Sequence, residues 1–324
     1  MSLEKYVKKF SKLRSDHNAN WPATARGRSP YKPMLLLAVI DLFAYGRLTT
    51  NLIRLTPELG DLFHIYCGQV LPPDWACNIA MPFFHMKSEG FWELQPLPGQ
   101  ETVLASGRRL HSAGRLQETV AGAVLDDELY QLLCVAETRQ ILQAALIETY
   151  FDAPTQARLL TQTTINAGAF QYSRELLAGA LGQESAIKEV AEKYAPAVRD
   201  QGFRRAVVLT YDHRCALCGI RMLTPEGHTA VAAAHIVPWH ISHDDDPRNG
   251  MALCHLCHWT FDKGLLGVSA RYRVLTSPRL TTDQNMPGHL VTLSNREILG
   301  PIERELWPDT GALKWHLKEV FRRV

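Results

Sequence analysis

The chain has 324 residues, of which 46% are hydrophobic and 21% are charged, and its formal net charge is +2. These proportions are typical of globular proteins and exclude wholesale disorder and a fibrous repeat. The longest apolar runs fall far short of the ~20 residues that cross a bilayer, so we expect no membrane span. Residues 1–10 lack the apolar core of a signal peptide, which predicts a cytoplasmic location. At roughly 100–200 residues per domain, the length predicts two domains.

The first 155 residues predict a domain of mixed α and β structure. Apolar residues at helical spacing in 1–20 predict a helix, and a basic loop rich in Pro and Gly follows at 21–33. The apolar run Met34–Phe43 predicts a buried core helix, with Pro33 in its first turn and Gly46 after its end. Leu59–Tyr66 predicts another helix. The leucine spacing over 126–151 predicts one or two helices that close this domain.

Two aromatic runs and a change of composition complete the outline of the chain. Met81–Met86 and Gly90–Leu94, with a turn-like segment between them, predict a β-hairpin. After residue 155 the chain becomes rich in Gln, Thr, Ala and Gly, so we interpret 156–198 as a linker with a helical segment at Ala186–Tyr194. Residues 199–324 then form the second domain. The fold class expected is α+β.

Four of the seven cysteines form two C-x2-C pairs, Cys215 with Cys218 and Cys254 with Cys257. Two tight turns of this kind direct four thiolates at one ion, so the spacing predicts a tetrahedral Zn²⁺ site; the alternative is two unrelated reduced pairs. Four sulfur ligands leave no open position for a substrate, so we expect this zinc to be structural. The other cysteines are expected to be small buried side chains and not disulfides: Cys67, Cys77 and Cys134.

Between and beyond the two pairs stand His235 after an apolar strand, Asn249 before a glycine, and His258 with Asp262 four residues later. In this order the sequence resembles the HNH endonucleases, the ββα-metal nucleases, in the branch with an interleaved four-cysteine zinc. The resemblance covers roughly Phe203–Pro278. It implies a C-terminal domain that hydrolyses phosphodiester bonds.

The resemblance assigns roles that suit the chemistry of each side chain. His235 is the expected general base, because imidazole accepts a proton near neutral pH. Asn249 is expected to fix the backbone around His235 through its side-chain amide. His258 and Asp262 lie on one helix face and are expected to hold a catalytic divalent metal, Mg²⁺ or another ion. In the family the residue before the base is commonly another metal ligand, whereas here it is Ala234.

Each of these residues also has a simpler interpretation. His258 can be a spare zinc ligand, Asp262 a capping or ion-pairing residue, and Asn249 a turn residue. Asp244–Asp246 and the histidines before them can recruit a second metal, although a solvated turn is the expectation.

The first domain also shows a resemblance, carried by Arg26–Pro33 with the following apolar helix and by Asn78–Leu94. These segments resemble the sulfur-binding domains of modification-dependent restriction endonucleases, which recognise phosphorothioate DNA. The resemblance implies that Pro82 and Phe83 line an apolar pocket for sulfur; the simpler interpretation places both in the core. It also implies that Arg28, Tyr31 and His85 contact neighbouring phosphates or bases. The family's aromatic-proline-aromatic element begins here with Met81.

Together these features predict a metal-dependent DNA endonuclease of the restriction or phage-defence type, directed to modified and specifically to phosphorothioate DNA. One alternative is an HNH nuclease directed by methylated bases or by a partner protein. Another is a zinc-stabilised DNA-binding protein without catalysis, which Ala234 makes conceivable. DNA is the expected partner, and a homodimer is left open.

Overall fold

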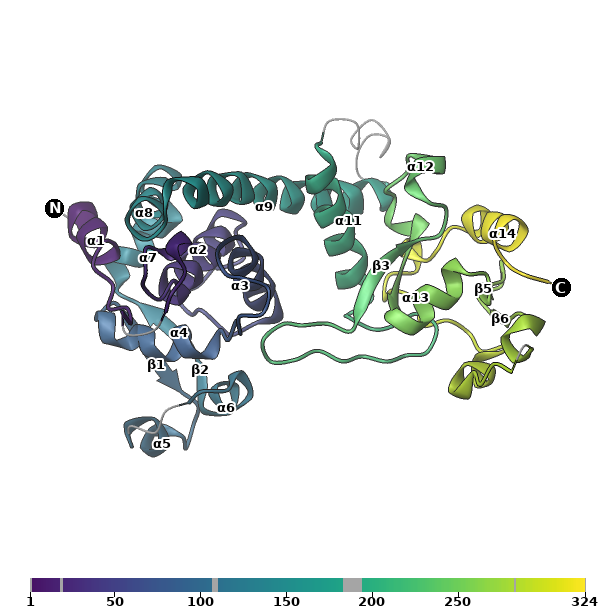
Figure 1. The fold of residues 1–324 in the computed structure, drawn as a ribbon, viewed down its shortest axis with the longest axis horizontal. Helices are drawn as coiled ribbons and strands as arrows, with labels where there is room; N and C mark the ends of the chain where they lie inside the picture. Colours follow the sequence, from purple (N-terminus) through teal and green to yellow (C-terminus); the bar gives the residue numbers. More distant parts are fainter. Residues whose placement is uncertain (1, 18–19, 107–109, 183–193, 283, 324) are drawn as a thin grey trace. The chain divides into compact units, whose positions relative to one another are not determined.

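The computed structural model describes residues 2–17, 20–106, 110–182, 194–282 and 284–323. It divides into two compact units, the first formed by Met1–Ala167 with Thr224–His228 and the second by Gly168–Leu223 with Thr229–Val324. Both are mostly helical and carry small antiparallel sheets, which confirms the predicted α+β class (Figure 1). Among the described residues, no helix is long and apolar enough to cross a membrane.

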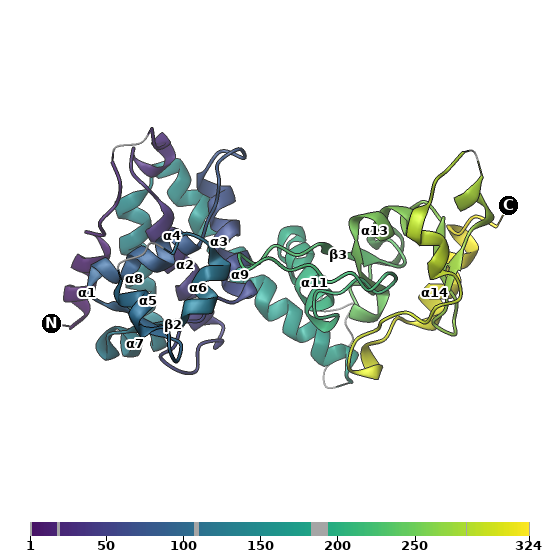
Figure 2. The same cartoon turned by 90° about the horizontal axis from the view of Figure 1, so that it is seen from below.

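Helix α2 (Tyr31–Ala44) forms the centre of the first unit. Every residue from Lys32 to Phe43 is buried, and the helix packs against α3, α4, α7 and α8, which surround it in both ribbon views (Figures 1 and 2). The remaining helices up to α8 are α1 (Ser2–Phe10), α3 (Pro57–Val70), α4 (Ala80–His85), α5 (Glu101–Ala105), α6 (Ala113–Thr119), α7 (Asp127–Cys134), α8 (Ala136–Tyr150) and the 3₁₀ helices η1 (Ala23–Ala25) and η2 (Met86–Glu89). The helices predicted in this part of the chain are therefore confirmed.

One carboxylate lies inside this helical core. Asp41 on α2 is 2% exposed, and its Oδ2 accepts hydrogen bonds from the Tyr66 hydroxyl at 2.7 Å and from Asn166 Nδ2 at 2.9 Å. Burial raises the pKa of the Asp41 carboxyl to about 7, against the opposing effect of these hydrogen bonds. The group therefore changes its charge near neutral pH.

Strand β1 (Trp92–Pro96) pairs antiparallel with β2 (Val120–Leu125) and not with the earlier aromatic run. The predicted hairpin is wrong, because Met81–Met86 is helical and belongs to α4 and the start of η2. Asn78 explains the difference, since its Oδ1 accepts from the backbone N–H of Ala80 at 2.9 Å. A side chain that satisfies a free amide at a helix start favours the helix over an extended strand.

The cysteines outside the two C-x2-C pairs differ from the expectation. Cys67 at the end of α3 forms a disulfide with Cys77, with their Cα atoms 6.4 Å apart. A turn in which Trp75 N–H donates to Pro72 O at 3.1 Å brings the loop back towards α3. Cys134 is free and exposed. Cys67 is buried and Cys134 is unbonded, as predicted. The prediction is wrong for the bonding of Cys67 and Cys77 and for the burial of Cys134.

The long helix α9 (Ala153–Ala180) occupies most of the segment that was interpreted as a linker. Its threonines satisfy their hydroxyls inside the helix: Thr161, Thr163 and Thr164 each donate to the carbonyl four residues earlier, at 3.0–3.1 Å. A composition rich in Thr and Gln is therefore compatible with a regular helix here. Most of the helix predicted at Ala186–Tyr194 lies outside the described residues.

The second unit is built on two strands and a helix. Strand β3 (Val231–His235) pairs antiparallel with β4 (Gly250–Cys254), with His235 opposite Gly250, and α13 (His255–Asp262) follows directly and packs on both strands (Figure 1). The remaining elements are α11 (Pro196–Thr210), α12 (Trp239–Ser242), β5 (Leu266–Val268), β6 (Val274–Thr276), α14 (Thr310–Glu319) and the 3₁₀ helices η3 (Pro247–Asn249), η4 (Pro278–Thr281), η5 (Gly288–Leu293) and η6 (Arg304–Leu306).

Helix α11 packs against this ββα core at a position that requires glycine. A Cβ at Gly250 would lie 2.7 Å from Val207 Cγ2 and 2.8 Å from Phe203 Cζ, both on α11. The absence of a side chain therefore allows the helix to approach the strand closely. The same approach places Phe203 beside His235.

Candidate functional site

The four paired cysteines form one cluster. Cys215 and Cys218 lie in the turn after α11, Cys254 ends β4 and Cys257 lies in the first turn of α13. Gly219 shapes the first turn with φ +80°, and its N–H donates to Cys215 O at 3.0 Å.

The geometry of the cluster fits a tetrahedral zinc ion. All four Sγ atoms lie within 4.8 Å of one another, and Cys218 Sγ lies 3.7 Å from Cys254 Sγ. Zn–S bonds of about 2.3 Å in a tetrahedron place the sulfurs about 3.8 Å apart. The hydrogen bond with Cys218 lowers the pKa of the Cys215 thiol, which favours the thiolate, the form that binds metal.

His235 ends β3 and is held from two directions. Its Nε2 lies 2.8 Å from Asp245 Oδ1, and its ring stacks on the Phe203 ring with centroids 3.9 Å apart and planes 9° apart. A carboxylate oxygen accepts, so Nε2 carries the proton and the lone pair lies on Nδ1. The side chain is 24% exposed, which leaves the imidazole accessible to a small reactant.

Asp245 was expected in a solvated turn, and that prediction is wrong. It is 1% exposed, and its Oδ2 accepts from the Tyr172 hydroxyl at 2.9 Å and from Arg199 Nε at 3.0 Å. Burial raises the pKa of the Asp245 carboxyl, but the hydrogen bonds from His235, Tyr172 and Arg199 outweigh burial and hold the pKa below its ordinary value. Arg199 in turn lies over the Trp239 ring, 3.4 Å from its centroid.

Asn249 joins the two ends of the loop that follows His235. Its Oδ1 accepts from Val237 N–H at 2.9 Å, and its Nδ2 donates to Val237 O and Asp244 O, both at 3.0 Å. The residue is 4% exposed. Asn249 therefore ties the backbone at Val237 to the backbone at Asp244.

His258 and Asp262 share one face of α13, as the spacing predicts. His258 Nε2 lies 3.5 Å from Asp262 Oδ2, and both side chains line a cavity of about 410 Å³ together with His235. Ala234 is buried and does not line this cavity. Within the part of the chain that the structure describes, the four cysteines are the sole group of three or more residues placed to hold one ion.

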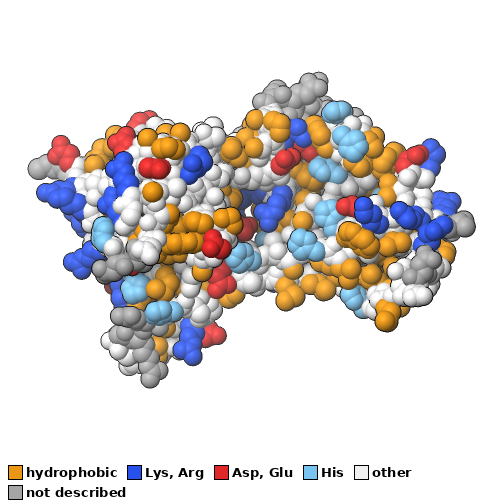
Figure 3. Space-filling view, in the orientation of Figure 1, with side chains coloured by type: hydrophobic (Ala, Val, Ile, Leu, Met, Phe, Trp, Pro, Cys, Tyr) orange, Lys and Arg blue, Asp and Glu red, His pale blue; other side chains and the backbone are white. Residues whose placement is uncertain are grey.

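One residue of this cavity was missed in the sequence. His316 on α14 lines it, stacks on the Phe261 ring with centroids 3.7 Å apart, and its Nε2 lies 3.0 Å from Phe261 O. Burial lowers the pKa of His316 to about 4, so the ring is neutral near pH 7. Histidine side chains gather on the face of the second unit that Figure 3 shows.

A cavity of about 400 Å³ in the first unit brings together three of the five predicted DNA-binding residues, Tyr31, Pro82 and His85. Met81 and Trp21 also line it. The Trp21 ring meets the Tyr31 ring edge-on with centroids 5.5 Å apart, and the Tyr31 hydroxyl donates to Ala76 O at 2.5 Å. Most of the exposed wall is therefore apolar, and Arg14, Asp16 and Lys32 add charged groups to the lining.

Two predicted residues lie elsewhere. Phe83 is fully buried and its ring packs edge-on against Trp92 with centroids 5.1 Å apart. The prediction that it lines the pocket is wrong, because α4 turns neighbouring side chains to different faces. Arg28 is held by its own domain, since its guanidinium donates to Thr149 O and lies 4.1 Å from the Tyr150 ring centroid.

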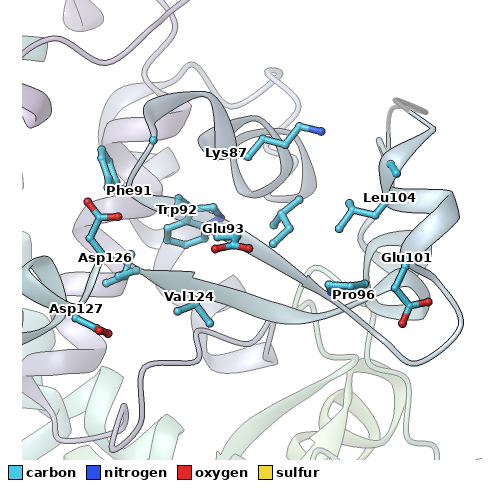
Figure 4. Close-up of a pocket in the computed structure, with 14 residues that line it drawn as sticks. Lys87, Phe91, Trp92, Glu93, Pro96, Glu101, Leu104, Val124, Asp126 and Asp127 are labelled. Carbon is cyan, nitrogen blue, oxygen red and sulfur yellow. The ribbon is translucent and has the colours of Figure 1, made fainter.

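Another cavity, of about 850 Å³, lies on the first unit between η2, β1, β2 and α5 (Figure 4). Among the described residues that line it, four carry carboxylates, Glu93, Glu101, Asp126 and Asp127, and one, Lys87, carries an ammonium group. This excess of negative charge repels phosphate. The cavity is therefore unsuited to a DNA backbone, in contrast to the apolar pocket beside Tyr31.

Comparisons with known proteins assign both halves. Residues 4–168, just over half of the chain, match the family described as ScoMcrA-like, DNA sulfur-binding domain. The chain belongs to this family. Residues 215–269 match the family described as HNH endonuclease, so the chain also contains an HNH domain. Both resemblances predicted from the sequence are confirmed.

More distant comparisons add little. A solved structure described as modification dependent TagI restriction endonuclease is similar, with 24% sequence identity and a TM-score of 0.28. The similarity covers 36% of this chain and 37% of that one, so the chain spans little more than a third of that enzyme. No curated protein matches.

Proposed function

We propose that this protein is a metal-dependent DNA endonuclease that cuts phosphorothioate DNA, with the sulfur-binding domain choosing the target and the HNH domain hydrolysing the phosphodiester bond. The observation that carries the proposal is the meeting of His235, His258 and Asp262 at one cavity of the HNH domain. These are the groups that phosphodiester hydrolysis requires, in a chain whose other half belongs to a sulfur-binding family.

His235 is the general base in this proposal. Its Nδ1 accepts a proton from a water molecule, because Nε2 is committed to Asp245. Stacking on Phe203 holds the ring plane, and the Asn249 hydrogen bonds to Val237 hold the backbone next to it. The imidazole is therefore oriented before a substrate arrives, which removes the cost of orienting it during reaction.

His258 and Asp262 would hold the catalytic divalent ion, Mg²⁺ or a related metal. Their donor set, one imidazole nitrogen and one carboxylate oxygen, suits such ions and leaves positions for water and phosphate. When bound, the ion would neutralise charge on the scissile phosphate. The four-cysteine cluster would hold a structural zinc, whose ligands come from the turn after α11, from β4 and from α13.

The apolar pocket of the first unit would accept the sulfur of the modified phosphate. Sulfur is larger and less strongly hydrated than oxygen, so transfer to a pocket walled by Pro82, Met81 and Trp21 costs less free energy. Tyr31 and His85 would contact neighbouring polar groups of the DNA. This arrangement reads the modification itself, while basic side chains supply binding that depends on salt and not on sequence.

Cleavage assays test the catalytic half. Phosphorothioate, methylated and plain plasmids of one sequence are incubated with the full chain and Mg²⁺, Mn²⁺ or Ni²⁺. We expect the phosphorothioate plasmid to be cut, and His235→Ala to lower the rate by roughly 10²- to 10⁴-fold with DNA affinity and zinc content unchanged. His289→Ala, which changes an exposed histidine, is the matched control. Full cleavage by His235→Ala would refute the assignment of the base.

The same plasmids separate the alternatives. Preferential cutting of methylated DNA would replace sulfur by a methylated base as the target, and equal cutting of all three would indicate direction by a partner. Binding of phosphorothioate DNA without cutting under any of the metals would favour a zinc-stabilised binding protein.

A further inference from the structure

We propose that Asp245 is a positioning residue of the HNH domain, which sets the orientation of the His235 imidazole, and that Tyr172 and Arg199 hold Asp245 in place. The inference rests on the proposed function, because it concerns the same base. It concerns three residues, of which Asp245 lies within the matched residues 215–269 and Tyr172 and Arg199 precede them in the chain.

The two carboxylate oxygens of Asp245 have separate partners. Oδ1 takes the hydrogen bond from His235 Nε2 at 2.8 Å. Oδ2 takes those from the Tyr172 hydroxyl at 2.9 Å and Arg199 Nε at 3.0 Å. With Oδ2 fixed by two donors from α9 and α11, the carboxylate plane cannot rotate freely, so the direction of Oδ1 is set before it meets the imidazole.

Two contacts therefore fix the orientation of the His235 imidazole. The hydrogen bond to Asp245 sets the rotation of the ring within its plane, and the Phe203 ring, stacked 3.9 Å away, sets the plane itself. Because a carboxylate accepts only, the proton is on Nε2 and the lone pair is on Nδ1. This is the tautomer in which Nδ1 can serve as the base.

The charge of the Asp245 carboxylate has a partner besides His235. The carboxylate faces the Arg199 guanidinium, and the side chains of Asp245 and Arg199 are 2% and 11% exposed. This buried ion pair compensates the charge of Asp245, so the carboxylate can remain in place to accept the hydrogen bond from His235. His258 and Asp262 on α13 line the same cavity.

The backbone of the loop supports the same arrangement. Asn249 Nδ2 donates to the Asp244 carbonyl at 3.0 Å, and Asp246 Oδ1 accepts from the N–H of Arg248 at 2.8 Å as the cap of η3. Asp245 therefore stands between two fixed neighbours. The backbone on both sides therefore restricts the orientation of the Asp245 side chain towards His235.

The experiment compares wild type with Asp245→Asn and Tyr172→Phe in the full chain, with Asp212→Asn as the matched control at an exposed aspartate. The first readout is the protonation state of the imidazole nitrogens, from ¹⁵N NMR of protein labelled at histidine, with the His235 signals identified by their loss in His235→Ala. We expect an Nε2–H tautomer in wild type and a shift towards Nδ1–H in Asp245→Asn, because an amide can donate to Nε2.

The second readout is single-turnover cleavage of phosphorothioate DNA across pH. We expect Asp245→Asn to lower the rate by roughly 10²- to 10³-fold, less than full loss of a general base, with unchanged DNA affinity. The acidic limb of its pH profile should move to lower pH, because a neutral amide stabilises the imidazolium less than a carboxylate does. Tyr172→Phe, which removes one hydroxyl and keeps the packing, should lower the rate by roughly 3- to 10-fold.

An unchanged tautomer together with a rate within twofold of wild type in Asp245→Asn would overturn the inference. If Asp245→Asn fails to fold, Tyr172→Phe decides: a cleavage rate and a His235 tautomer equal to those of wild type in this variant would also overturn the inference. The NMR readout does not depend on cleavage. If wild type cuts no DNA but has the Nε2–H tautomer, and Asp245→Asn loses that tautomer, the positioning role is supported and the nuclease proposal is refuted.

Discussion

The buried carboxyl group of Asp41 makes the stability of the first unit depend on pH. Its pKa rises from an ordinary value of 3.8 to about 7 in the folded chain. The folded state therefore binds the proton more tightly than the unfolded state, and the stability associated with the neutral carboxyl is present in full below about pH 4 and lost as the pH rises through about 7. We expect Asp41→Asn, a neutral residue of the same shape, to remove this loss.

The magnitude follows from the two pKa values. Each unit of pKa corresponds to about 1.4 kcal/mol, so the ionised carboxylate costs about 4 kcal/mol at high pH. Between about pH 5 and about pH 9 the free energy of unfolding of wild type should fall by about 3 kcal/mol relative to Asp41→Asn. At roughly 2–4 °C per kcal/mol for a unit of this size, the two Tm values should diverge by roughly 6–12 °C.

The assay is differential scanning calorimetry of the full chain at several pH values, with the difference between wild type and variant as the observable. The difference cancels contributions common to both proteins, such as the pH dependence of the cysteine cluster. Asp74→Asn, at an exposed aspartate, is the matched control and should follow wild type at every pH. A constant difference between wild type and Asp41→Asn across this range would refute the reasoning.

Three further predictions concern the cluster, the pocket and the disulfide. Cys257→Ser should lose the zinc ion and the cooperative unfolding of the second unit, measured by elemental analysis and calorimetry, whereas Cys134→Ser at a free exposed thiol should keep both; a retained ion would contradict the assignment. Met81→Ser should reduce the preference for phosphorothioate over plain duplex by roughly 3- to 10-fold in binding titrations, whereas Met286→Ser at a residue 91% exposed should not; equal losses would argue against the pocket. Cys67→Ser should lower the free energy of unfolding of the oxidised first unit by roughly 2–3 kcal/mol. If oxidised wild type and Cys67→Ser have the same free energy of unfolding, the disulfide is not formed.

Much of the HNH domain could be predicted because its motifs consist of residues close together in the sequence. The two C-x2-C turns, the strand before His235 and the i, i+4 pair of His258 and Asp262 each follow from short-range spacing, and the structure places them as expected. Asp245 was not predictable in this way. A sequence that reads as an acidic turn becomes buried because Tyr172 and Arg199, 73 and 46 residues away, donate to it.

In the first unit, the sequence did not predict which side chains line the apolar pocket. Pro82 and Phe83 are neighbours in the sequence, yet only Pro82 lines the apolar pocket, while Phe83 packs against Trp92 in the core. Reading Met81–Met86 as a strand obscured this, since residues on a strand alternate between two faces and those on a helix spread around its axis. The walls contributed by Trp21 and Met81 depend on the helical geometry.

Helix α9 donates hydrogen bonds to a buried carboxylate in each of the two units. Asn166 donates to the buried Asp41 of the first unit, and Tyr172, six residues later on the same helix, donates to Asp245 in the second. The boundary between the two compact units lies between these residues, after Ala167. A crossover before Asn166 would separate Asp41 from this donor, and a crossover after Tyr172 would separate Asp245 from its own. Recombination that joins this sulfur-binding domain to a different second domain should therefore have its crossover point between residues 166 and 172.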